Sequence, residues 1–164
     1  MQSSETIKTL YRIKRGLASY VSYLAACEMN ESFSEYILYE PTLRILTACL
    51  YVAKCEVPCP GFKKVGRGDV KKIDFVAASS SDTFALEMKW VRAKRVNVAP
   101  NLLKLQNYTQ ANRGHRAFLL LFGRRSNLED IKLDLSFLKE QGKAVYADLG
   151  ITQFGCRNYE LKDA

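Results

Sequence analysis

Two carboxylates and a lysine on neighbouring apolar segments are the residues of this sequence best placed to do chemistry. Asp74 lies in the run KIDF, and Glu87 and Lys89 lie in the run ALEMKW. In both runs polar residues interrupt β-branched, aromatic and other apolar residues, as in a strand with one buried face. The intervening SSSD has the composition of a turn. We therefore expect strands over residues 71–78 and 83–91 that form a hairpin.

The register of this hairpin follows from its apolar residues. Antiparallel pairing about the serine-rich turn places Asp74 opposite Glu87, and the alternation of side chains then puts Lys89 on the same face as both. The other face would carry three apolar pairs, Ile73 with Met88, Phe75 with Leu86, and Ala77 with Phe84. A shift by one residue would destroy this separation of charged and apolar faces, so the pattern favours this register.

The opposed carboxylates need a reason to face each other. Side chains directly opposite in an antiparallel pair have Cβ atoms about 5 Å apart, and like charges at that separation are destabilising. A divalent cation removes the repulsion, and oxygen ligands of this kind suit Mg²⁺, with Mn²⁺ as a substitute. Lys89 could then orient or activate a water bound to the metal and neutralise charge that develops on a phosphoryl group.

The pattern resembles that of the PD-(D/E)XK nuclease superfamily, in which an Asp on one strand precedes Glu-x-Lys on the next. The resemblance spans about residues 40–122, and Ile73 stands where the family name has proline. It implies an α/β fold of the restriction endonuclease-like type, a three-layer sandwich with a central mixed β-sheet flanked by helices. By the same resemblance Asp74, Glu87 and the backbone carbonyl of Met88 would bind the metal, and Lys89 would assist the attacking water.

The family pattern also includes an acidic residue on a preceding helix. Glu40 is the expected match, as a further catalytic residue and metal ligand, because it begins the helix before the first core strand; Glu35 is less favoured because it lies further from that strand. Asp69 competes with Asp74 for the strand aspartate. We prefer Asp74, because a hairpin based on Asp69 would have to be longer and would leave Asp74 unexplained.

The remaining elements alternate between helical and extended patterns. We expect helices over residues 4–28, about 41–50, about 100–112 and 128–141, and further strands over 51–58, 116–122 and 143–149. Gly114 lies where a helix C-terminal cap belongs, and the tail from Gly150 has no clear pattern. The sequence thus predicts one nuclease-like domain over 1–164 with an N-terminal helical extension of about 1–34.

The charge of the chain favours a polyanionic partner. The formal net charge is +8, and lysine and arginine residues at phosphates release counterions. The candidate nucleic-acid contacts are Lys71, Lys72, Arg92, Lys94, Arg95, Lys104, Gln106, Arg124 and Arg125. A solvated helix face explains Lys104 and Gln106 equally well, and we expect such a face for Lys8, Arg12, Lys14 and Arg15.

These features define a function and its alternatives. We expect a Mg²⁺-dependent nuclease that acts as an endonuclease on DNA in preference to RNA. Cleavage of both strands would call for a homodimer, and a separate partner would supply specificity. The alternatives are a catalytically silent protein of the same fold that binds nucleic acid or a protein, and a toxin-type RNase. No apolar run reaches the roughly 18–20 residues of a membrane span, and the N-terminal residues lack the basic-then-apolar order of a secretory signal. The five scattered cysteines suit reduced thiols, so we expect a cytoplasmic protein without a membrane association.

Overall fold

A seven-stranded mixed sheet forms the centre of the fold in a computed structural model that describes residues 3–29, 33–62, 70–131, 133, 136–150 and 152–162. The strands are β1 (Val52–Pro58), β2 (Lys72–Ala78), β3 (Thr83–Val91), β4 (Arg116–Arg124), β5 (Leu138–Glu140), β6 (Val145–Ala147) and β7 (Phe154–Leu161). Their order is β1-β2-β3-β4-β7-β5, with β6 also paired to β7. β3 and β4 are parallel, whereas the other pairs are antiparallel.

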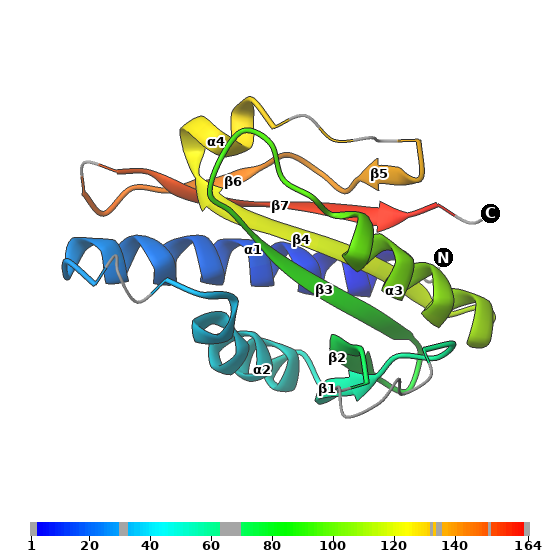
Figure 1. Cartoon of the computed structure of the whole chain (residues 1–164). Helices are drawn as coiled ribbons and strands as arrows, with labels where there is room; N and C mark the ends of the chain where they lie inside the picture. The colour runs from blue at the N-terminus through cyan, green and yellow to red at the C-terminus, as the bar shows by residue number, and fades with distance from the viewer. Residues whose placement is uncertain are drawn as a thin grey trace.

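Helices cover both faces of this sheet and complete a three-layer arrangement. They are α1 (Ser3–Ala26), the 3₁₀ helix η2 (Glu35–Leu38), α2 (Tyr39–Ala48), α3 (Ala99–Ala111) and α4 (Arg125–Glu129). Leu17 of α1 and Leu46 of α2 belong to the core on one face, and Leu105 of α3 belongs to the core on the other. Figure 1 shows α1 behind the sheet and α3 in front of it. The predicted α/β class with a helix-flanked mixed sheet is confirmed.

The central hairpin has the predicted register. β2 and β3 pair from Phe75 opposite Leu86 to Ala78 opposite Thr83. The apolar face is as expected except for Ile73, which lies in the core beneath α3, whereas Phe75 lies in the core beneath α1 and α2. The two cores are on opposite faces, so β2 rotates about its axis between these residues. On the neighbouring strand Glu56 has a φ of +53° at this same level of the sheet.

Two predictions for the C-terminal third were wrong or incomplete. The helix expected over 128–141 is limited to α4, and Leu138 instead begins the strand β5, opposite Leu161 of β7. The tail that had no clear pattern forms β7, which pairs with β4, β5 and β6. β5 pairs along the edge of β7 that faces away from β4, and this pairing outweighs the helical spacing of the leucines.

The N-terminal helix packs as part of this core. Leu10, Ile13 and Leu17 of α1 are buried against the sheet, and contacts of α1 with β7 are among its most extensive. Lys14, expected on a solvated face, is 2% exposed. Within the described ranges no helix is long and apolar enough to cross a membrane.

Candidate active site

The candidate site lies where β2 and β3 cease to pair, one residue beyond the pairing of Phe75 with Leu86. The backbone N–H of Asp74 donates to Oε1 of Glu87 over 3.2 Å. In return, the backbone N–H of Met88 donates to Oδ2 of Asp74 over 2.7 Å. Each carboxylate therefore accepts a hydrogen bond from a backbone N–H of the other strand, where a backbone carbonyl would accept it in a regular sheet. The two acids are thus held next to each other, as predicted.

Tyr39 of α2 holds the Asp74 side chain from the helical layer. Its hydroxyl lies 2.8 Å from Oδ1 of Asp74 and 3.1 Å from Oε1 of Glu56, and its single proton can serve only one of these acceptors at a time. Burial raises the pKa of the Tyr39 hydroxyl, and the negative charge of Asp74 raises it further. Tyr39 is therefore a neutral hydrogen-bond donor to the acid pair.

Two side chains of α3 reach Glu87 from the opposite layer. The Lys104 Nζ lies 2.5 Å from Oε2 of Glu87, and Nδ2 of Asn101 donates to the same oxygen over 2.7 Å. Lys104 also donates to the backbone carbonyl of Lys72 over 2.7 Å. The Glu87 side chain is fully buried, and each of its oxygens accepts a hydrogen bond.

Burial sets the ionisation of the acid pair. It raises the pKa of Glu87 to about 7, with a further contribution from the charge of Asp74 and opposing contributions from Lys104 and Asn101. Burial also raises the pKa of Asp74, opposed mainly by the hydrogen bonds from Met88 and Tyr39. Additional positive charge at this position would therefore stabilise the doubly ionised pair.

Lys89 lies on β3 beyond Glu87, where β2 no longer covers the edge of the strand. Its Nζ is 3.3 Å from Oε1 of Glu35, and the same oxygen accepts the backbone N–H of Trp90 over 3.0 Å. The backbone donors of Met88 and Trp90 along this edge are thus bound by the carboxylates of Asp74 and Glu35. Glu35 both closes the edge and fixes the Lys89 ammonium.

Of the two helical acids, the structure brings Glu35 to β3 beside Lys89 and does not bring the preferred Glu40 to the acid pair. The Glu40 side chain is 63% exposed and pairs with Arg44 one turn along α2. Its place at the start of α2 directs it away from the sheet, whereas the 3₁₀ helix η2 brings Glu35 to β3. A cavity of about 220 Å³ is lined by Glu35, Tyr36, Tyr39, Glu56, Val70, Lys72, Asp74 and Lys104, and Glu40 is not among them.

The donor chemistry of the pair fits a small oxygen-binding cation. Asp74 and Glu87 supply carboxylate oxygens, and the Met88 carbonyl belongs to the same stretch of β3. Mg²⁺ commonly takes one or two carboxylates and keeps several waters, so two acids suffice. Across the described ranges no group of three or more His, Cys, Asp or Glu residues is arranged to hold a metal. Asp69, the rival aspartate, lies outside the described residues.

The predicted nucleic-acid contacts divide between several places. Lys71 and Lys72 lie at the start of β2, where Lys71 covers the Phe62 ring at 4.5 Å and Lys72 is 3.6 Å from Glu56. Lys104 points into the acid site, so the solvated-face interpretation of it was wrong. Gln106 lines a separate cavity near His115. Lys72 and Lys104 place positive charge beside Asp74, with which they line one cavity.

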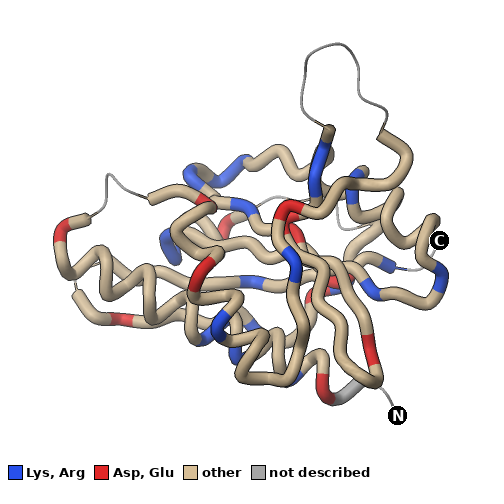
Figure 2. Tube along the Cα trace, turned by 90° about the horizontal axis from the view of Figure 1, so that it is seen from below, with Lys and Arg blue, Asp and Glu red and all other residues tan. Residues whose placement is uncertain are grey.

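The remaining basic residues lie at or just beyond the C-terminal ends of β3 and β4. Lys94 pairs with Asp130, and Arg125 is 2.7 Å from Glu129, so both are partly neutralised. Arg95 is exposed, and the exposed Arg92 and Arg124 line a cavity of their own. Figure 2 shows basic segments along the whole trace, with acidic segments among them.

Tyr39 and Asn101 are the site residues that the sequence did not reveal. No signal distinguishes Tyr39 from the other tyrosines. Asn101 precedes Lys104 by one helical turn, so the two share a helix face, and the same spacing would have placed it near any partner of Lys104.

Comparison of the chain with protein-family models, with curated proteins and with solved structures finds no match. A function is therefore inferred from the geometry of Asp74, Glu87, Lys89 and their partners.

Proposed function

We propose that this protein is a metal-dependent nuclease of the restriction endonuclease-like type, hydrolysing phosphodiester bonds in DNA. The observation that carries the proposal is the meeting of two buried carboxylates, Asp74 and Glu87, at the point where two strands separate, with Lys89 next along the same strand. The resemblance of these residues to the PD-(D/E)XK pattern supports the same conclusion.

Each group of the site has a role that its surroundings suit. Asp74, Glu87 and the Met88 carbonyl would hold Mg²⁺ or Mn²⁺, which when bound polarises the phosphoryl group and activates water. Glu35 holds the Lys89 ammonium in place, and this ammonium would position the attacking water and offset negative charge on the phosphoryl oxygens. Asn101 and Lys104 orient Glu87, and Tyr39 orients Asp74.

A cleavage assay tests the proposal directly. Supercoiled plasmid, single-stranded DNA and RNA are incubated with the protein in Mg²⁺, in Mn²⁺ and in EDTA. We expect cleavage of DNA that requires metal and that is lost in Glu87→Gln and in Lys89→Ala. Glu40→Gln and Lys8→Ala are matched controls, because each removes the same charge from an exposed position outside the site. Undiminished cleavage by Glu87→Gln would refute the assignment.

One observation favours a second function, a protein of this fold that binds nucleic acid without cleaving it. The Lys104 ammonium, 2.5 Å from Glu87, already supplies an internal cation to the acid pair. If Lys104 stays paired with Glu87 when Mg²⁺ is added, calorimetry would detect no Mg²⁺ binding. DNA binding would persist and would weaken as the salt concentration rises. Under the nuclease proposal, Mg²⁺ binding is measurable and is lost in Glu87→Gln.

A further inference from the structure

A cavity of about 430 Å³ lies at the ends of β3 and β4, away from the acid pair. It is lined by Phe33, Trp90, Arg92, Arg124, Asn127 and Phe154, with Val91 between. We propose that this cavity binds one nucleotide unit of a nucleic-acid strand, with its base against the aromatic side chains and its phosphate at the two arginines. The inference rests on the proposed function, because it identifies where the bound strand continues beyond the cleaved bond.

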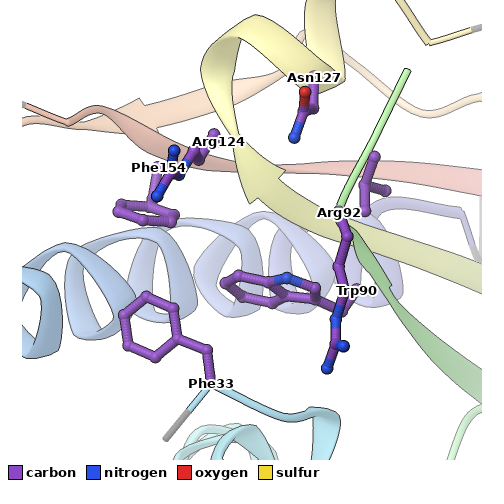
Figure 3. A pocket seen from close by; sticks show the side chains of 7 residues that line it. Phe33, Trp90, Arg92, Arg124, Asn127 and Phe154 are labelled. Carbon is purple, nitrogen blue, oxygen red and sulfur yellow. The ribbon is translucent and has the colours of Figure 1, made fainter. Parts of the chain in front are cut away.

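The aromatic side of the cavity is a fixed cluster of rings. The Phe33 ring is edge-on to Trp90 with centroids 5.2 Å apart, and edge-on to Phe154 at 5.4 Å. Phe122 supports Trp90 from the core at 4.8 Å. Phe154 and Phe122 are buried, whereas Trp90 keeps part of its surface open. Figure 3 shows the rings of Phe33, Trp90 and Phe154 grouped on one side of the cavity, with Asn127 across from them. A preformed aromatic surface of this kind suits stacking of a base.

The two arginines supply charge that no acidic side chain among the described residues neutralises. Arg92 and Arg124 are exposed, and neither guanidinium has an acidic or hydrogen-bonding partner in the part of the chain that the structure describes. The neighbouring Lys94 and Arg125, by contrast, are paired with Asp130 and Glu129. No acidic residue lines the cavity among the described residues. Two guanidinium groups beside one cavity supply the positive charge and the hydrogen-bond donors that a phosphate accepts.

The position of the cavity suits a strand that also reaches the acid pair. Glu87, Lys89, Trp90 and Arg92 follow one another along β3 and just past its end. At about 3.3 Å per residue, Arg92 lies roughly 16 Å along the strand direction from Glu87. A single-stranded segment of a few nucleotides covers such a distance, and binding folds contact about four or more nucleotides at once.

The aromatic and basic groups together favour a nucleotide over its parts. A phosphate alone would use the arginines and leave the open surface of Trp90 uncovered, and an apolar ligand would leave both guanidinium groups without a partner. An arginine beside the half-buried Trp90 can also stack on a base through its planar cation. The cavity is thus complementary to a base and a phosphate held together.

The chain contains a single tryptophan, so Trp90 reports on the cavity by its own fluorescence. The probe is a decamer of deoxythymidine in EDTA, where metal-dependent cleavage cannot occur. We expect the decamer to quench Trp90, and Arg92→Ala and Arg124→Ala each to weaken binding at least about tenfold. Each substitution should also reduce the slope of log affinity against log salt by about one. Arg15→Ala, an exposed arginine of α1, removes the same charge elsewhere and should leave binding unchanged.

Smaller probes separate the base from the phosphate. Thymidine monophosphate should compete with the decamer better than either thymidine or inorganic phosphate does. Inorganic phosphate competing as well as the nucleotide would overturn the proposal, because it would reduce the cavity to an anion site. Trp90→Ala, followed with a fluorescently labelled decamer and checked for folding by circular dichroism, should weaken binding about tenfold or more.

The outcome separates this inference from the nuclease proposal. Equal affinities of Arg92→Ala, Arg124→Ala and Arg15→Ala for the decamer would overturn the cavity assignment, even if the wild-type protein cleaves DNA in Mg²⁺. Conversely, arginine-dependent quenching of Trp90 by a protein that cleaves nothing would uphold the cavity and refute the catalytic assignment.

Discussion

The amino group of Lys104 lies 2.5 Å from Oε2 of Glu87 and donates in addition to the backbone carbonyl of Lys72. A side chain of α3 thereby connects β2 and β3 at the level where their backbones no longer pair. The lysine is 15% exposed and the glutamate is fully buried, so water screens the pair little. Lys104 is therefore the internal counter-ion of the acid pair and a tie between three elements.

Removing this counter-ion should destabilise the fold. Lys104→Met keeps the aliphatic length of the side chain but leaves the buried Glu87 carboxylate with Asn101 and the Asp74 N–H alone. Loss of one partner of a buried ion pair costs about 3–5 kcal/mol, and we expect a loss in the lower part of that range because Lys104 is partly exposed. Urea unfolding at pH 8 in EDTA measures it.

A double variant shows whether the loss arises from the unpaired charge. Lys104→Met with Glu87→Gln carries no buried carboxylate, so it should recover most of the stability that Lys104→Met loses. Additive losses from the two substitutions would contradict a direct interaction between these residues.

The raised pKa of Glu87 makes stability depend on pH. The pKa rises from its ordinary value of 4.5 to about 7 on folding, chiefly because of burial, so the folded protein binds this proton more tightly. Protonation of Glu87 contributes its full stabilisation below pH 4.5. This stabilisation decreases as the pH rises to 7 and is absent above that pH. The change is on the order of 3 kcal/mol, at roughly 1.4 kcal/mol per pH unit.

The comparison of wild type with Glu87→Gln isolates this contribution. Free energies of unfolding are measured in EDTA from pH 4.5 to pH 8, and the difference between the two proteins should change across the interval and level off near pH 7. A constant difference would show that Glu87 titrates at its ordinary value. Mg²⁺ should restore stability to the wild type above pH 7 and not to Glu87→Gln.

The hairpin was predictable because its register is fixed by a physical conflict. A slip of one residue between 71–78 and 83–91 would have mixed the charged and apolar faces and exposed residues such as Phe75 and Leu86, which are both buried. The exception, Ile73, could not be foreseen, because its transfer to the other core depends on a rotation of β2 beside Glu56. The opposition of Asp74 and Glu87 and the candidacy of Lys104 were within reach of the sequence, whereas Tyr39 of α2 and Asn101 of α3 were not.

Two features could not be predicted from the sequence. One is which of Glu35 and Glu40 lies at the site, and the other is the strand β7. Both acids precede β1 closely, and only the turn of η2 into α2 decides which one meets β3. The sequence of β7 mixes Arg157, Asn158 and Glu160 with apolar residues, so it lacks the signature of a strand buried between neighbours. Its burial follows from pairing with β4 and β5, which are distant in sequence.

Substitution of Glu35 and substitution of Glu40 should have unequal effects on DNA cleavage. Glu35→Gln weakens the hold on Lys89 and on the backbone of Trp90, so DNA cleavage should fall about 10–100-fold, as for other residues that orient a catalytic group. Glu40→Gln breaks only an exposed pair with Arg44 and should retain wild-type cleavage. Initial rates of plasmid cleavage in Mg²⁺ give the ratio. A greater loss in Glu40→Gln would return Glu40 to the site.

Lys14 tests whether α1 is part of the cooperative fold. Its ammonium donates to the carbonyls of Gln141, over 3.0 Å, and of Lys143, over 2.9 Å, on either side of Gly142. Lys14→Met removes the donor from both carbonyls, and a hydrogen bond from a charged group is worth about 1.5–3 kcal/mol. We therefore expect a loss of about 2 kcal/mol or more in urea unfolding.

The matched control lies two turns earlier in the same helix. Lys8→Met makes the identical chemical change at an exposed position, where the pair with Glu5 is surrounded by solvent, so stability should change by less than about 0.5 kcal/mol. Equal effects would mean that the turn carbonyls find other donors and that Lys14 is not required to join α1 to the sheet. A large loss for Lys14→Met alone, in a single unfolding transition, would show that α1 unfolds together with the strands, because the broken contacts join the helix to the segment between β5 and β6.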